Sequence, residues 1–276
     1  MKTVLKQWTQ LGLGVALAGG TLAACGNPGQ ASDAPEIEIS APQPPVEAAE
    51  LGEAEGGEGE GGVAIEQAAT DPVVFLSALA ITEAHIIAAR DAHELGENDA
   101  AAEMFAHPVS EVLFDIQPVF QRLGVEDFGD LLTDTSAAIF AGETPAQISA
   151  RSDGIIAALR TAAEKAPASD LSDASIAARV AADQFERAAY MYSLSLESDA
   201  YEPYLDGYGF FKAGERVFLA SGDDIAEENQ RAATALIEAI AKLEEAYPTA
   251  LLPETLSADL STVTVAASNA VLAAQN

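Results

Sequence analysis

Over most of the chain, apolar residues recur every three to four positions within segments that begin and end with helix-capping residues. This pattern restricts the possible folds more than any other feature of the sequence. Asp71-Pro72 places an N-cap residue before a proline suited to the first helical turn, and Gly96 is a typical helix stop. Between them, apolar and small side chains recur in one stripe. The alternation of period two that is typical of strands is essentially missing. We therefore predict an all-α fold.

The same signals predict further helices along the chain. Their expected ranges are 98–107, 108–123, 127–141, 145–165, 171–196, 203–220, 223–247 and 256–274. Short connections between helices of this length favour antiparallel neighbours, so residues 70–276 are expected to form one up-and-down helical bundle. A two-part organisation of the bundle, divided near residues 167–169, stays open.

Residues 25–69 differ from the rest of the chain in composition. Five prolines are followed by a tract in which glutamate and glycine dominate, and no Lys or Arg occurs between Lys6 and Arg90. Such a segment cannot bury enough apolar surface to offset its ordering entropy, so we predict a disordered acidic linker. It is either a passive spacer or a brush of carboxylates that concentrates cations weakly.

Residues 1–24 have the pattern of a secretory signal peptide. Lys2 and Lys6 precede a short apolar run that is below the ~20 residues a membrane-spanning helix needs. The run ends in Leu22-Ala23-Ala24-Cys25, which resembles the lipobox of bacterial lipoproteins. This resemblance implies cleavage before Cys25 and lipidation of that residue, and Gly26 after it implies the periplasmic face of the outer rather than the inner membrane. The alternative is an ordinary signal peptide followed by a free thiol.

The charge of the chain excludes several classes of partner. It carries 13 basic against 44 acidic residues, a formal charge of −31. Nucleic acid is excluded because its binding needs Lys and Arg at the phosphates, and an anionic membrane surface would repel the chain. We therefore expect membrane contact through the lipid anchor only. The single cysteine also excludes an intramolecular disulfide and a thiolate zinc site.

All the histidines of the chain lie close together in the sequence. His85, His93 and His107 fall between residues 85 and 107, and Glu103, His107 and Glu111 are spaced by four. A continuous helix would align the last three on one face, although Pro108 must either kink that helix or begin a new one. Because imidazoles and carboxylates bind first-row metals in bundle cores, we predict a metal site formed by these five histidines and glutamates. The alternative is that they are ordinary packing and capping residues.

A second cluster is aromatic. Five of the six tyrosines lie between residues 190 and 208, and glycines follow at 207, 209 and 214. A glycine costs about 1 kcal/mol in a helix interior, so these glycines indicate close approach of another helix or of a ligand. Tyr204, Asp206 and Tyr208 are candidate metal ligands or partners of ligands. Aromatic packing at one end of the bundle is the alternative.

Three segments carry a resemblance to a known group of proteins. They are Glu83-Ala84-His85-Ile86, His107-Pro108-Val109-Ser110-Glu111 and Tyr204-Leu205-Asp206-Gly207-Tyr208-Gly209-Phe210. Together they resemble the extracytoplasmic helical domains associated with bacterial high-affinity iron permeases and, more loosely, imelysin-like periplasmic proteins. The resemblance implies a role in iron handling, with a permease or another envelope protein as partner. The Arg-Glu-x-x-Glu transport motif and the imelysin His-x-x-Glu motif are missing, so it implies neither transport nor peptidase activity.

The chain lacks the short motifs of common enzyme classes, including the nucleophile elbow, the phosphate-binding loop and the dinucleotide-binding glycines. We therefore expect a protein that is not an enzyme. The function predicted is a lipid-anchored periplasmic accessory protein that binds iron or another divalent or trivalent metal ion. The alternative is a non-catalytic interaction or structural lipoprotein of the envelope.

Overall fold

The computed structural model describes residues 64–276, and these residues form helices and connecting loops without a strand. The prediction of an all-α fold is confirmed. The signal peptide, Cys25 and the predicted linker up to residue 63 lie outside the described residues. A short helix, α1 (Ile65–Ala68), occupies the last part of the predicted linker, and its Ala68 is fully buried. The packed body therefore begins a few residues before the predicted boundary.

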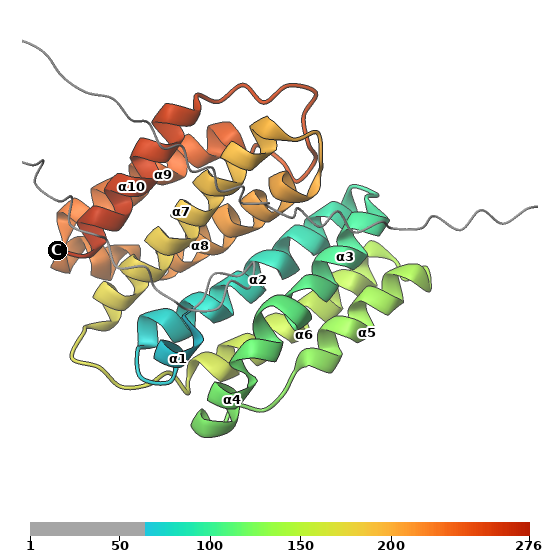
Figure 1. Cartoon of the computed structure of the whole chain (residues 1–276), viewed down its shortest axis with the longest axis horizontal. Coiled ribbons are helices and arrows are strands. Elements are labelled where there is room, and N and C mark those ends of the chain that lie inside the picture. Colours follow the sequence, from blue (N-terminus) through green and yellow to red (C-terminus); the bar gives the residue numbers. More distant parts are fainter. Residues whose placement is uncertain (1–63) are drawn as a thin grey trace, which may run out of the picture. The chain divides into compact units, whose positions relative to one another are not determined.

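The other helices follow in chain order. They are α2 (Pro72–Glu94), α3 (Asn98–Pro108), the π-helical turn η1 (Val109–Leu113), α4 (Phe114–Leu123), α5 (Gly129–Phe140), α6 (Pro145–Ala163), α7 (Asp173–Glu197), α8 (Glu202–Glu228), α9 (Gln230–Ala246) and α10 (Leu260–Ala274). In Figure 1, α2 to α6 lie in one half of the bundle and α7 to α10 in the other. The α2 helix contacts both α7 and α8 and so joins the two halves.

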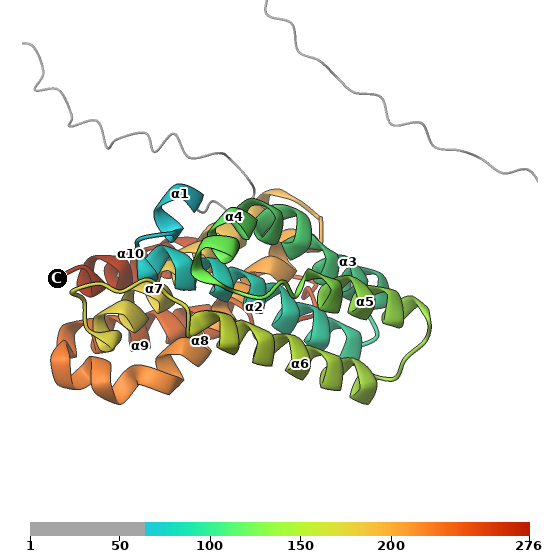
Figure 2. The same cartoon turned by 90° about the horizontal axis from the view of Figure 1, so that it is seen from below.

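The α2 helix is the central element of the bundle. Figure 2 shows it in the interior, with α4 on one side and α6 on the other. It begins as predicted, because the Asp71 side chain accepts hydrogen bonds from the amides of Val73 and Val74 and Pro72 fits the first turn. Among the described residues, α2 is long and apolar enough to cross a membrane, but 83% of its apolar window is buried in the bundle. A helix at the centre of a core is surrounded by other helices and therefore has an apolar composition on all sides.

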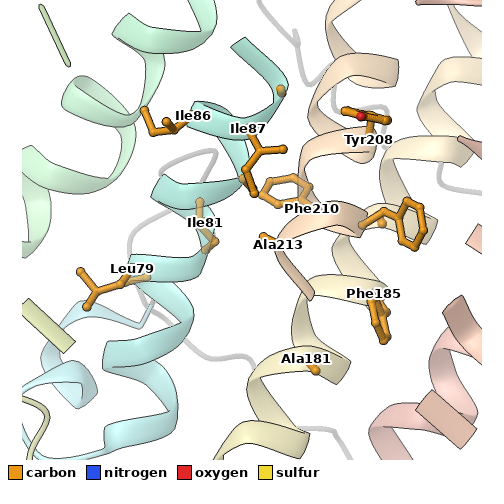
Figure 3. Close-up of a cluster of buried hydrophobic side chains, with 14 of the residues drawn as sticks. Leu79, Ile81, Ile86, Ile87, Ala181, Phe185, Tyr208, Phe210 and Ala213 are labelled. Atoms are coloured by element: carbon orange, nitrogen blue, oxygen red, sulfur yellow. The ribbon is translucent and has the colours of Figure 1, made fainter. Parts of the chain in front are cut away.

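One hydrophobic core runs through both halves of the bundle. Figure 3 shows Ile87 of α2 beside Phe210 of α8, with Phe185 of α7 farther along the same cluster. The side chains at these positions are nearly or fully buried. The sequence left open whether the bundle is divided into two parts. The two halves have one common hydrophobic core.

Gly207, Gly209 and Gly214 of α8 lie where other parts of the chain approach closely, as the sequence predicted. A Cβ atom at Gly207 would overlap the ring of Tyr247, and one at Gly214 would lie 2.6 Å from the ring of Phe185. Contacts this short exclude a side chain. The glycines therefore set how near α8 packs to its neighbours.

The helix boundaries predicted near residues 221 and 256 are wrong. The α8 helix continues through residues 221–222, where a break was predicted, and ends only at Glu228. Burial of Ile225 holds this extra part of α8 to the core, and the Asn229 side chain then caps α9 by accepting from the Ala232 amide. The last helix starts at Leu260 rather than near residue 256, because Asp259 caps it.

Candidate metal centre

His85 lies on α2 with only 4% of its surface exposed. Its Nδ1 lies 2.8 Å from the carbonyl oxygen of Ile81. A carbonyl can only accept, so Nδ1 carries the proton and Nε2 presents a lone pair. Burial lowers the pKa of the His85 imidazole, which favours the neutral ring. A neutral imidazole held in one tautomer is the form that binds metal ions.

Two carboxylates face the Nε2 atom of His85. Asp206 Oδ1 on α8 is 3.5 Å away, and Glu111 Oε2 on η1 is 3.7 Å away. Donor atoms lie about 3–4 Å apart when each is about 2.1 Å from a shared metal ion. Each carboxylate oxygen therefore lies at a spacing from His85 Nε2 that two ligands of one cation can have, and the three residues come from three different helical elements.

His107, at the end of α3, extends this cluster. Its Nδ1 lies 3.8 Å from Glu111 Oε1 and 3.8 Å from Glu202 Oε1. The His85 and His107 rings have centroids 6.2 Å apart, so Glu111 lies between two imidazoles with one oxygen toward each. One ligand atom each from His85, His107 and Asp206 lie within 4.8 Å of one another. We call His85, His107, Glu111, Glu202 and Asp206 the histidine–carboxylate cluster.

The wide turn η1 explains how His107 and Glu111 point to the same place. Pro108 has no amide hydrogen and its ring crowds the preceding turn, which breaks the regular hydrogen-bond pattern of a helix. The chain neither stops nor starts a new helix here but continues through the five residues of η1 into α4. Such π-turns occur often at functional sites. This one carries Glu111 toward α2, where its Oε2 lies 3.7 Å from His85 Nε2.

His93 lies apart from the cluster. It follows His85 by eight residues on α2, about 12 Å along the helix axis. Its Nδ1 lies 2.8 Å from Asn98 Oδ1, a contact that fastens the turn between α2 and α3. Glu103 is also peripheral, since it is 66% exposed and reaches only the outer nitrogen of His107, at 4.0 Å.

The two candidate tyrosines point away from the cluster. The Tyr204 hydroxyl donates to the Thr249 carbonyl at 2.8 Å, and the Tyr208 hydroxyl donates to Asp91 Oδ2 at 2.7 Å. Burial raises the pKa of both phenols, so they stay protonated donors. Of the three candidates on this segment, only Asp206 reaches the histidines.

Sequence reasoning missed Glu202. The spacing in the sequence could have indicated it, because Glu202 precedes Asp206 by four residues and both therefore lie on one face of α8. Two imidazoles and three carboxylates form a donor set of nitrogen and oxygen atoms, which suits first-row transition metals. Comparison of the chain with protein families, with curated proteins and with solved structures finds no match.

Proposed function

We propose that this chain is a metal-binding accessory protein of the bacterial periplasm and that the histidine–carboxylate cluster binds iron or a similar first-row cation. The observation that carries the proposal is the convergence of His85, His107 and Asp206, whose ligand atoms lie within 4.8 Å of one another. His85 and Asp206 are 121 positions apart in the sequence, so the packing of the helices is what brings these side chains together.

The donor set favours a hard or borderline cation. With neutral imidazoles, the three carboxylates of the cluster supply a charge of −3, which can balance a divalent or a trivalent ion. The cluster contains no sulfur ligand, so it does not favour soft ions such as Cu(I). Ferrous, ferric, manganese and zinc ions fit these donors.

The proposed location rests on the sequence. The apolar run that ends in Leu22-Ala23-Ala24-Cys25 supports lipid anchoring at Cys25, and the acidic stretch behind it supports a tether to the membrane. The resemblance to domains associated with iron permeases makes a permease, or another envelope protein, the proposed partner. We propose no catalytic activity.

A second candidate function is a non-catalytic interaction lipoprotein of the envelope. It is favoured by large apolar side chains on the surface of the bundle, of which Phe114 is 77% exposed and Leu219 is 75% exposed. Exposed aromatic and aliphatic side chains are common anchors of protein–protein interfaces. This candidate does not need the cluster to bind an ion.

Calorimetric titration of the mature chain with ferrous, manganese and zinc ions, without oxygen for iron, tests the proposal. We expect saturable binding by the wild type and a loss of affinity of about 100-fold or more in the His85→Ala/His107→Ala double variant. The His93→Ala variant is the matched control and should bind as the wild type does. Circular dichroism checks that each variant folds. Equal affinity, or equal absence of binding, in the wild type and the double variant would overturn the proposal.

A further inference from the structure

A second polar group lies on the opposite side of α2 from His85. Residues two apart in a helix point in nearly opposite directions, and Glu83 precedes His85 by two. The Glu83 side chain is only 7% exposed, and its Oε1 lies 2.7 Å from Arg160 Nη2 of α6 and 3.0 Å from Arg216 Nη1 of α8. Two guanidinium groups on one carboxylate leave a net charge of +1, in a chain whose formal charge is −31.

A cavity of about 550 Å³ opens beside this ion triad. It lies between α2, α6, α7 and α8 and beneath the loop that joins α6 to α7. Its walls are mainly aliphatic, and they include Leu76, Leu79, Leu159, Ile176, Val180 and Val217. This volume and this lining are typical of sites for small molecules, which are apolar with a few charged groups that fix the orientation of the ligand.

The charged groups of the cavity have distinct positions. Glu83 and Arg160 line it from α2 and α6, and Asp173 lines it from the first turn of α7. The partial positive charge of a helix N-terminus offsets part of the charge of Asp173. Arg160 is 55% exposed and Arg216 is 40% exposed, and each guanidinium has more N–H donors than its contact with Glu83 uses. The rim near Glu83 can therefore accept an anion.

We propose that this cavity binds a small amphipathic carboxylate, with its hydrocarbon part among the aliphatic walls and its carboxylate paired with Arg160. The arginines disfavour a cation, and an uncharged hydrocarbon would leave the guanidinium donors without a new acceptor. A ligand with several negative charges would be repelled by Asp173 and by the acidic surface. A single carboxylate on an apolar chain pairs with Arg160, fills the aliphatic walls and brings the least negative charge near Asp173.

Decanoate is the probe that tests the proposal on the mature chain. We expect saturable binding of one decanoate by calorimetry, and displacement by decanoate of a fluorescent polyene fatty acid. Decanol has the same chain without the charge and should bind about tenfold more weakly. Substitution Ala177→Trp places an indole in the cavity and should abolish binding.

Charge variants separate the ion pair from general packing. Arg160→Gln should weaken decanoate binding by about tenfold and remove the preference over decanol, whereas Arg160→Lys should keep that preference. Arg151→Gln is the matched control, because Arg151 lies on the same helix but pairs with Glu143 outside the cavity. The His85→Ala/His107→Ala variant should bind decanoate normally, so this proposal is independent of the metal site. Equal binding of decanol and decanoate by the wild type, or no saturable binding by the folded chain, would overturn it.

Discussion

Gly209 of α8 packs directly against the backbone of Ala84 on α2, so that a Cβ atom at position 209 would lie 2.5 Å from the Ala84 carbonyl oxygen. Ala84 immediately precedes His85, and Gly209 follows Asp206 by three residues on α8. The close approach of the two helices therefore occurs beside the pair His85 Nε2 and Asp206 Oδ1, which lie 3.5 Å apart. The missing side chain at position 209 sets the width of the candidate metal centre.

We predict that Gly209→Ala lowers the free energy of unfolding by about 1–3 kcal/mol, because the new methyl group must push α8 away from α2. Metal affinity should fall as well, since the same shift separates Asp206 from His85. Gly154→Ala is the control, because no atom lies within 4 Å of a Cβ at that position of α6 and alanine should stabilise the helix by about 1 kcal/mol. Urea unfolding compares the two. A stable Gly209→Ala protein with unchanged metal affinity would contradict this account.

We predict that acid destabilises the metal-free protein partly through His85. Burial lowers the pKa of His85 in the folded state. The hydrogen bond to the Ile81 carbonyl opposes this shift, as do Glu111 and Glu202, and the nearby His107 adds to it. The unfolded chain then binds more protons than the folded one below about pH 6.5, so stability is full above that pH and is lost as the pH falls, by up to about 1.4 kcal/mol per pH unit.

The measurement is urea unfolding of the metal-free wild type and His85→Asn at about pH 7.5 and about pH 5. Stability of the variant should fall less between the two pH values. Asp206 also faces the ring of His85 and stays in place in both proteins. An identical loss of stability in the two proteins would show that His85 does not contribute.

We predict that tyrosine hydroxyls hold the extended segment between α9 and α10. Tyr201 donates to the Ala250 carbonyl at 2.6 Å and Tyr204 to that of Thr249 at 2.8 Å. Tyr204→Phe should cost about 1 kcal/mol and accelerate hydrogen exchange over residues 248–259. Burial raises the pKa of Tyr201 to about 12, so this donor keeps its proton at the pH of the experiment. Tyr190→Phe, at a position 60% exposed, should change neither quantity.

We predict that Cys25→Ser releases the protein from the membrane fraction or blocks its processing, because lipid would be attached to the cysteine thiol and to the new amine. Fractionation of cells and the mass of the mature protein are the measurements. The Cys25→Ser variant should fold and bind metal as the wild type does, since Cys25 lies outside the described bundle. Unchanged fractionation and unchanged mass would refute the anchor.

Local signals in the sequence were enough to predict most helices. Asp71, Pro72 and Gly124 act within a few residues of themselves, as a cap, a first-turn proline and a left-handed C-cap. A break was predicted within α8 because Ser221 and Gly222 are weak helix formers. The helix continues because Ile225 is buried, and this burial depends on parts of the chain that are distant in sequence. Propensity is local, but packing decides whether a weak position ends a helix.

The candidate site was only partly readable from the sequence. The i to i+4 spacing of His107 and Glu111 is a local signal, and the structure brings these two residues to His85. The place of Asp206 and Glu202 depends on which helix packs against α8. The glycines of α8 indicate a close approach, but no spacing within α8 shows that α2 is the helix that approaches. His93 shares the apolar stripe of α2 with core residues, and its polar partner is Asn98 rather than the cluster.

The π-turn at η1 is equivalent to one residue inserted into a regular helix. It sets the direction in which the side chains of α4 point relative to those of α3. Before it, α3 aims His107 at α2 and α8; after it, α4 turns Ile116 and Phe120 into the core. Loss of one residue here would rotate one stretch of helix by about 100° against the other, so either the histidine–carboxylate cluster or the core contacts would be misplaced.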